Sequence, residues 1–159
     1  MNDIAKMIHK EDPDHLATTI LAGINKTEID YINTRCTELD LISVQVYGGL
    51  AAVPQQLLSA GWERPYMVTE WGPTGLWEGL KTSWNALIEE TSSEKAAVYK
   101  SRYEYSIERD KDKCLGSYVF LWGTKTGKNT HLIWTVHRKG RGVRGCRRDT
   151  IFIDGEMAT

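Results

Sequence analysis

Residues 41–70 read LISVQVYGGLAAVPQQLLSAGWERPYMVTE, and the expected fold class follows from this stretch. Its first part, residues 41–47, is an apolar run rich in β-branched side chains that stops at two glycines, which predicts a strand. Residues 54–60 begin with proline and are followed by Gly61, the usual start and stop of a short helix. A second apolar run covers residues 66–69. The order strand, helix, strand predicts two parallel strands joined by a crossover helix.

The same alternation continues on both sides of this stretch. Thr27 and Thr91 each have an acidic residue three positions later, the spacing of a capping box, so a helix is expected to begin near each. The further predicted elements are a short amphipathic helix from Ile4 to before Pro13, a strand at 15–21, helices at 27–39 and 94–109, and a strand at 114–121. The strands are mostly apolar, as in parallel sheets covered on both faces. Four such units form either a small doubly wound sheet or half of a (β/α)₈ barrel, and composition does not choose between them.

The bulk composition excludes some classes of protein. The chain has 159 residues, 41% of them hydrophobic, which is enough for one core, and its net charge of −1 excludes chain-wide binding to polyanions. Cys36, Cys114 and Cys146 are far apart and are expected to be free or buried thiols. No stretch is apolar enough to cross a membrane and the N-terminus lacks a signal-peptide pattern, so we expect the chain as given to stay in the cytosol, without a membrane partner.

Polar and aromatic side chains end three successive predicted strands, at Tyr47, Glu70 and Trp122. In a barrel the strand ends converge on one mouth, so these side chains would share a pocket. Trp71 follows the carboxylate directly and Trp77 lies in the loop beyond it, and indole rings can stack on sugar rings. The pattern favours carbohydrate chemistry. The simpler interpretations are a solvated carboxylate at Glu70, a phenol in water at Tyr47, and tryptophans packed on their own scaffold.

Three short motifs carry a family resemblance: VYG at 46–48, TEWG at 69–72 and FLWG at 120–123. Together with an opening that reads helix, then DPDH, then strand, they make residues 4 to about 126 resemble the C-terminal half of the catalytic barrel in retaining glycoside hydrolases. That clan includes the family 2 β-galactosidase type and the family 5 cellulase type. The resemblance implies that residues 1–128 form strands five to eight of a (β/α)₈ barrel.

The resemblance also implies roles for the strand-end residues. Glu70 would be the nucleophile of a double displacement on an O-glycosidic bond, and Tyr47 would orient its carboxylate. Trp122 would form the floor of a sugar subsite, and Trp71 and Trp77 would line outer subsites of an oligo- or polysaccharide substrate. No metal or cofactor is expected, because the sequence has neither a ligand cluster nor a phosphate-binding glycine loop.

One part of the clan's catalytic machinery has no counterpart in the sequence. The clan's acid/base glutamate usually follows an asparagine, and no Asn-Glu pair occurs in this chain. We therefore expect a fragment of a hydrolase or transglycosylase that is inactive alone, whose intact parent could be secreted or periplasmic. Its open half-barrel face could associate with another half, because such a half exposes apolar strand edges.

The composition changes in the tail, residues 129–159. Six of the 20 lysines and arginines lie between Arg138 and Arg148, interleaved with glycine. Such a run is typical of nucleic-acid-binding arms, so the alternative function is a small α/β protein that binds nucleic acid; a solvated tail is the simplest interpretation. We favour a third, a frameshift near residues 130–134, because residues 134–152 read one base later permit an amphipathic helix like the clan's last one. Nucleic acid is then not an expected partner, and the tail is expected to be irregular and poorly ordered.

Overall fold

The computed structural model describes residues 1–75, 77–120, 152–153 and 156–157. Its elements are, in chain order, α1 (Asn2–Glu11), β1 (Thr18–Ala22), α2 (Lys26–Arg35), β2 (Leu41–Gln45), η1 (Gly48–Ala52), α3 (Val53–Ala60), β3 (Tyr66–Trp71), α4 (Ser92–Arg102), η2 (Tyr103–Glu108), β4 (Cys114–Val119), β5 (Phe152–Ile153) and β6 (Glu156–Met157). η1 is a 3₁₀ helix and η2 a π-helical turn. The predicted alternation of helices and strands is confirmed through β4.

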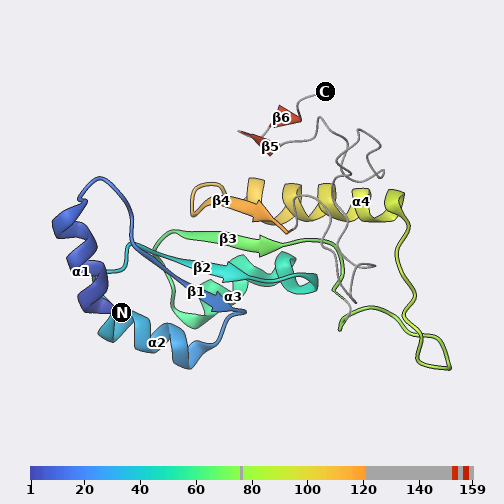
Figure 1. Cartoon of the computed structure of the whole chain (residues 1–159), viewed down its shortest axis with the longest axis horizontal. Coiled ribbons are helices and arrows are strands. Elements are labelled where there is room, and N and C mark those ends of the chain that lie inside the picture. The colour runs from blue at the N-terminus through green and yellow to red at the C-terminus, as the bar shows by residue number, and fades with distance from the viewer. Residues whose placement is uncertain (76, 121–151, 154–155, 158–159) are drawn as a thin grey trace.

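Strands β1 to β4 form one parallel sheet in the order β1-β2-β3-β4, and Figure 1 shows all four pointing the same way. Parallel strands are joined by right-handed crossovers, so an order that follows the chain places the connecting helices on one face. A doubly wound sheet needs a reversal of strand order, and the four described strands have none. The four described strands are therefore wound in one direction, an order found both in a segment of a barrel and in one half of a doubly wound sheet.

The core lies between this sheet and its helices. Ile29 of α2 and Leu57 of α3 are 0% and 2% exposed, and they join Ile42, Val44 and Val68 of the two central strands in one apolar cluster. Burial of such side chains stabilises the fold by about 1.5–3 kcal/mol each. The helices thus hold β2 and β3, whose carboxyl ends carry the predicted site.

Helix α2 begins and ends earlier than the sequence predicts. Its N-cap is Asn25, whose side chain accepts a 2.8 Å hydrogen bond from the Thr27 backbone N–H, so Thr27 does not open a capping box. The helix stops at Arg35, and the chain then turns so that Asp40 N donates to Ala17 O at 3.0 Å, beside the start of β1. By contrast, the capping box predicted at Thr91 is formed with Glu94.

The predicted helix 94–109 is two elements in the structure. α4 ends at Arg102 and a π-helical turn, η2, follows it. π-Helical segments are rare, and we have no local sequence signal that accounts for this one. Tyr99 and Ile107 are buried along the two elements, so both pack on the core.

Several sequence expectations lie outside the described residues. They include Trp122, Cys146, the basic run Arg138–Arg148 and the frameshift interpretation attached to it. Within the tail, β5 and β6 pair as antiparallel strands. Of the helices in the described ranges, none combines the length and the apolar character needed to span a bilayer.

Candidate active site

Tyr47 and Glu70 meet at the carboxyl ends of β2 and β3. The Tyr47 hydroxyl donates a 2.7 Å hydrogen bond to Glu70 Oε1, and Tyr47 is only 7% exposed. Burial, followed by the hydrogen bond and the negative charge of Glu70, raises the pKa of Tyr47 well above its ordinary value. The phenol is therefore protonated at neutral pH, and its hydrogen bond fixes the orientation of a half-buried carboxylate.

An irregular backbone at the end of β2 and of β3 directs the side chains of Tyr47 and Glu70 toward each other. β2 stops at Gln45, two residues earlier than predicted, and Tyr47 has φ −108° and ψ −93°, outside the β region, as the N-cap of η1. In β3 the register skips Thr69: Val44 is opposite Val68, and Gln45 is opposite Glu70. This β-bulge places Thr69 and Glu70 in succession on half-buried positions, and bulges commonly re-aim a side chain at an active site.

Gly72 has no side chain, which lets the chain after β3 pack closely against Phe120 and the Tyr47 ring. A Cβ atom at this position would lie 2.8 Å from the Phe120 carbonyl oxygen and 3.2 Å from the Tyr47 ring. The first distance is too short for any side chain, and the contact is to backbone, which cannot swing away. The glycine of the TEWG motif is thus explained by the close approach of the Phe120 backbone and the Tyr47 ring rather than by a turn.

The loop after β3 closes over Tyr47. Trp77 meets the Tyr47 ring edge to face, with centroids 5.3 Å apart and planes at 85°, and it is 66% exposed. The Glu78 carboxylate accepts hydrogen bonds from the backbone N–H groups of Gly48, at 2.8 Å, and Gly75, at 3.2 Å. Glu78 is exposed, and these hydrogen bonds tie the loop to the turn that carries Tyr47.

A second clamp holds the start of this loop. Arg102 Nη1 of α4 donates to the Gly72 carbonyl at 2.5 Å, and Thr74 Oγ1 donates to Glu90 Oε1 at 2.9 Å. Burial lowers the pKa of Arg102, and the nearby carboxylates of Glu78 and Glu90 oppose that shift. No motif in the sequence pointed to Arg102, because its contact to Gly72 spans 30 positions.

Trp71 is placed differently from the outer-subsite expectation. The ring is 0% exposed and stacks on Tyr103, with centroids 6.5 Å apart and planes at 24°, while Tyr99 lies edge-on at 5.8 Å. A fully buried ring offers no face to a sugar, so its role here is packing. The bulge at Thr69 explains the difference, because it puts Trp71 on the same buried side of β3 as Val68.

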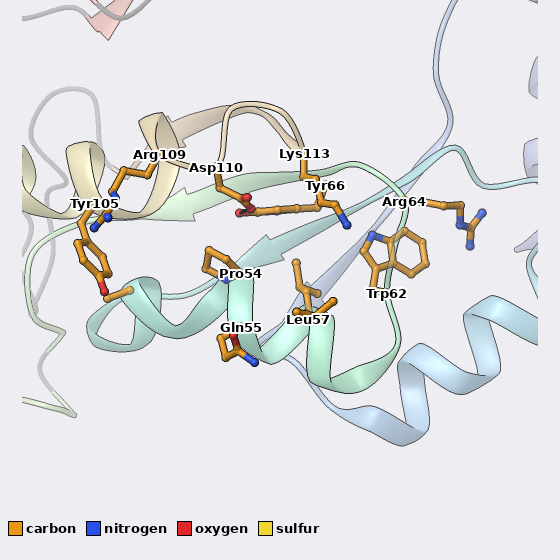
Figure 2. Close-up of a pocket in the computed structure, with 12 residues that line it drawn as sticks. Pro54, Gln55, Leu57, Trp62, Arg64, Tyr66, Tyr105, Arg109, Asp110 and Lys113 are labelled. Carbon is orange, nitrogen blue, oxygen red and sulfur yellow. Dashed lines mark hydrogen bonds between the residues drawn. The ribbon is translucent and has the colours of Figure 1, made fainter.

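A separate hollow of about 380 Å³ lies along α3 and the chain before β4 (Figure 2). Two of its cations lie over aromatic rings: Arg64 is 4.2 Å from the centroid of Trp62, and Arg109 is 4.9 Å from that of Tyr105. It includes Tyr66, which begins β3 roughly 13 Å along the strand from Glu70. Neither Glu70 nor its tyrosine partner lines this hollow, so it is distinct from the candidate site.

Comparison with known proteins gives little beyond this geometry. No protein-family model matches the chain, and no curated protein matches it. Among solved structures it is similar to a crystal structure described as a "putative beta-galactosidase" from Bacteroides fragilis, with a TM-score of 0.49 and 14% identity. The match covers 83% of this chain and 21% of that one, so the chain spans about a fifth of that protein's length. A likeness this distant establishes neither a family nor an activity.

Proposed function

We propose that the Tyr47–Glu70 pair is the nucleophile side of the active site of a retaining glycoside hydrolase or transglycosylase. In this proposal β2, β3 and β4 are the sixth, seventh and eighth strands of a (β/α)₈ barrel. The observation that carries it is the 2.7 Å bond from a buried phenol to a carboxylate at the mouth of adjacent parallel strands. Such mouths are where barrels place their chemistry.

The chemistry requires a carboxylate with one oxygen held and the other directed at the sugar. Tyr47 holds Glu70 Oε1, and no described residue donates a hydrogen bond to Oε2. Attack by Oε2 on the anomeric carbon forms the Glu70–glycosyl ester while the bond from that carbon to the leaving oxygen breaks. Tyr47 holds the attacking carboxylate in position through a charge-assisted hydrogen bond.

The leaving oxygen of a natural glycoside needs a proton from a second carboxyl group, about 5–5.5 Å from the nucleophile. The resemblance implies a glutamate preceded by asparagine for that task, and the sequence has no such pair. We therefore expect this chain alone to turn over natural glycosides poorly. A leaving group that is stable as an anion needs no proton, so the first step can be tested separately.

The test is mechanism-based labelling with 2,4-dinitrophenyl 2-deoxy-2-fluoroglycosides of the gluco, galacto and manno series. At least one should add a single fluoroglycosyl group to the folded chain, read by intact-mass spectrometry, with one dinitrophenolate released per label. Peptide mapping should place the label on Glu70. Glu70→Gln should abolish labelling, and Tyr47→Phe should slow it about tenfold or more, as expected for a lost charge-assisted bond.

Glu63→Gln is the matched control, because Glu63 is an exposed carboxylate shortly before β3. It should be labelled at the wild-type rate. Labelling that persists in Glu70→Gln, or a wild-type chain that no reagent labels, would refute the proposal.

A further inference from the structure

The loop between β3 and α4 carries an unusual set of exposed apolar side chains. Trp77, Leu80, Trp84 and Ile88 are 66%, 77%, 77% and 53% exposed, and all lie within residues 77–88, here called the arm. Figure 1 shows the loop beyond the carboxyl ends of the strands, on the side where Glu70 lies. Two exposed indole rings in so short a segment indicate a surface that binds a ligand or a partner molecule.

The arm is a formed hairpin. Lys81 and Leu87 make an antiparallel bridge, and the backbone N–H groups of Thr82 and Ile88 donate to Ala86 O and Leu80 O, each at 2.8 Å. The turn places Asn85 at φ 65°, in the left-handed region. The backbone that carries Trp84 is therefore ordered before a ligand binds, which lowers the entropy cost of binding.

The base of the arm is joined to the candidate active site. Trp77 lies against Tyr47, and Glu78 accepts from the backbone N–H of Gly48, next to it. Tyr47 in turn bonds Glu70. A chain molecule whose end sits at Glu70 would therefore meet the arm as it leaves the site.

A hollow of about 280 Å³ lies between the arm and the start of α4. Its charged lining consists of one ammonium and four carboxylates, which leaves three net negative charges: Lys95 against Glu78, Glu89, Glu90 and Glu94. Lys95 is itself paired with Glu89 at 2.5 Å. Carboxylates accept hydrogen bonds from hydroxyl groups, whereas they repel uronate, sulfate or phosphate groups.

We propose that the arm is an outer subsite at which Trp84 stacks on a sugar ring of an uncharged oligo- or polysaccharide bound at Glu70. This rests on the proposed glycosidase function and adds two things to it. The substrate is a chain rather than a small glycoside, because Trp84 lies at the tip of a hairpin beyond the site. It carries no anionic groups, because the acidic hollow beside the arm would repel them.

The test uses native affinity gels cast with neutral polysaccharides (mixed-linkage β-glucan, galactan, galactomannan and xylan) or anionic ones (polygalacturonate and alginate). Wild type should be retarded by at least one neutral polymer and by neither anionic one. Trp84→Ala should weaken that binding about tenfold, and Trp84→Phe should keep most of it, since a ring face remains. Tyr31→Ala is the matched control, because Tyr31 is 58% exposed on α2, and it should bind like wild type.

Labelling of Glu70 by the activated monosaccharide reagents distinguishes the two proposals, because such a reagent is too small to reach the arm. Trp84→Ala should label at the wild-type rate. If labelling succeeds but Trp84→Ala binds polysaccharide like wild type, or no neutral polymer retards the protein, the subsite is refuted and the proposed function stands. A Trp84→Ala change that converts a dimer to a monomer without affecting retardation would also refute the subsite, by assigning the arm to self-association.

Discussion

The hydroxyl of Tyr47 donates to Glu70 Oε1 at 2.7 Å, across the carboxyl ends of two neighbouring parallel strands. Burial is the first reason that the pKa of this phenol is raised, and the hydrogen bond and charge of Glu70 add to it. Tyr47 therefore remains a protonated donor at neutral pH and at pH 10, the ordinary pKa of a phenol. In this pair the phenol is the hydrogen-bond donor and the carboxylate is the acceptor.

The raised pKa of the buried phenols can be tested by tyrosine titration. In wild type, Tyr47 and Tyr66 should stay protonated at pH 10, the ordinary pKa of a tyrosine phenol, because burial and then a carboxylate, Glu70 or Asp110, raise the pKa of each. Tyr47→Phe should leave the absorbance change at 295 nm near pH 10 unaltered. Glu70→Gln should move the Tyr47 titration downward without restoring its ordinary value, because burial remains. Loss of a tyrosine that titrates normally in Tyr47→Phe would contradict the assignment.

Gly72→Ala should destabilise the protein by about 1–3 kcal/mol, as overpacking against fixed backbone does. Its Cβ atom would lie 2.8 Å from Phe120 O and 3.2 Å from the Tyr47 ring. Urea denaturation measures the change. Gly49→Ala is the control, since its Cβ would meet only Val46 Cγ2 at 3.4 Å, an ordinary contact. Equal stability of the two variants would argue against crowding at position 72.

Trp71 and Trp77 should behave oppositely. Trp71→Ala should cost about 3–5 kcal/mol, because the ring is 0% exposed between Tyr99 and Tyr103. Trp77→Ala should change stability by less than about 1 kcal/mol, because its ring is 66% exposed. Thermal and urea unfolding of both variants checks this. A stable Trp71→Ala protein would return Trp71 to the list of candidate sugar-binding residues.

Substitutions at Asn25 and Thr27 separate the two candidate starts of α2, and Thr91, the N-cap of α4, serves as a reference. Asn25→Ala and Thr91→Ala should each cost about 1 kcal/mol, because each side chain accepts from a backbone N–H at a helix start. Thr27→Ala should be close to neutral, since the Thr27 backbone N–H, and not its side chain, makes the capping bond. A larger loss of stability in Thr27→Ala than in Asn25→Ala would show that Thr27 is the cap, as the sequence predicts.

Asp40 links stability to acid pH. Burial raises its pKa, but hydrogen bonds from the Ala17 backbone N–H and from His9 outweigh that and lower it below 3.8. A carboxyl group with a lowered folded pKa adds stability above its unfolded pKa, and this is lost as pH falls through the folded value. Asp40→Asn should therefore lose on the order of 1 kcal/mol at neutral pH, with a shallower decline below about pH 4. Urea unfolding of wild type and Asp40→Asn at pH 3 and pH 7 tests this. If stability depends on pH identically in the two proteins, Asp40 is not a source of the acid sensitivity.

Elements set by local signals were predicted well. The apolar run of β2, the helix α3 and its left-handed stop at Gly61, with φ 85°, all follow from residues within a few positions of one another. The strand-end pair Tyr47 and Glu70 was also predicted, because parallel strands bring their carboxyl ends together.

Features set by distant partners were not predicted. Glu78 bonds the backbone of Gly48, 30 positions away, and nothing near Glu78 in the sequence marks it. The burial of Trp71 depends on Tyr99 and Tyr103, which belong to elements after the long loop. Asn25, and not Thr27, caps α2; both are good capping residues, and the capping-box spacing alone does not choose between them.

The skipped position at Thr69 has a consequence for how such a site can change over evolution. Because β3 holds one residue more than its neighbours need there, side-chain direction after Val68 is set by chain length as well as by residue type. A single-codon deletion at Thr69 would restore strict alternation and leave the following carboxylate and indole on their present faces, whereas closing the bulge without shortening the chain would turn both to the opposite face. The bulge thus lets a buried core strand absorb a one-residue length change, of a kind that substitution scans never sample, without turning the site residues away.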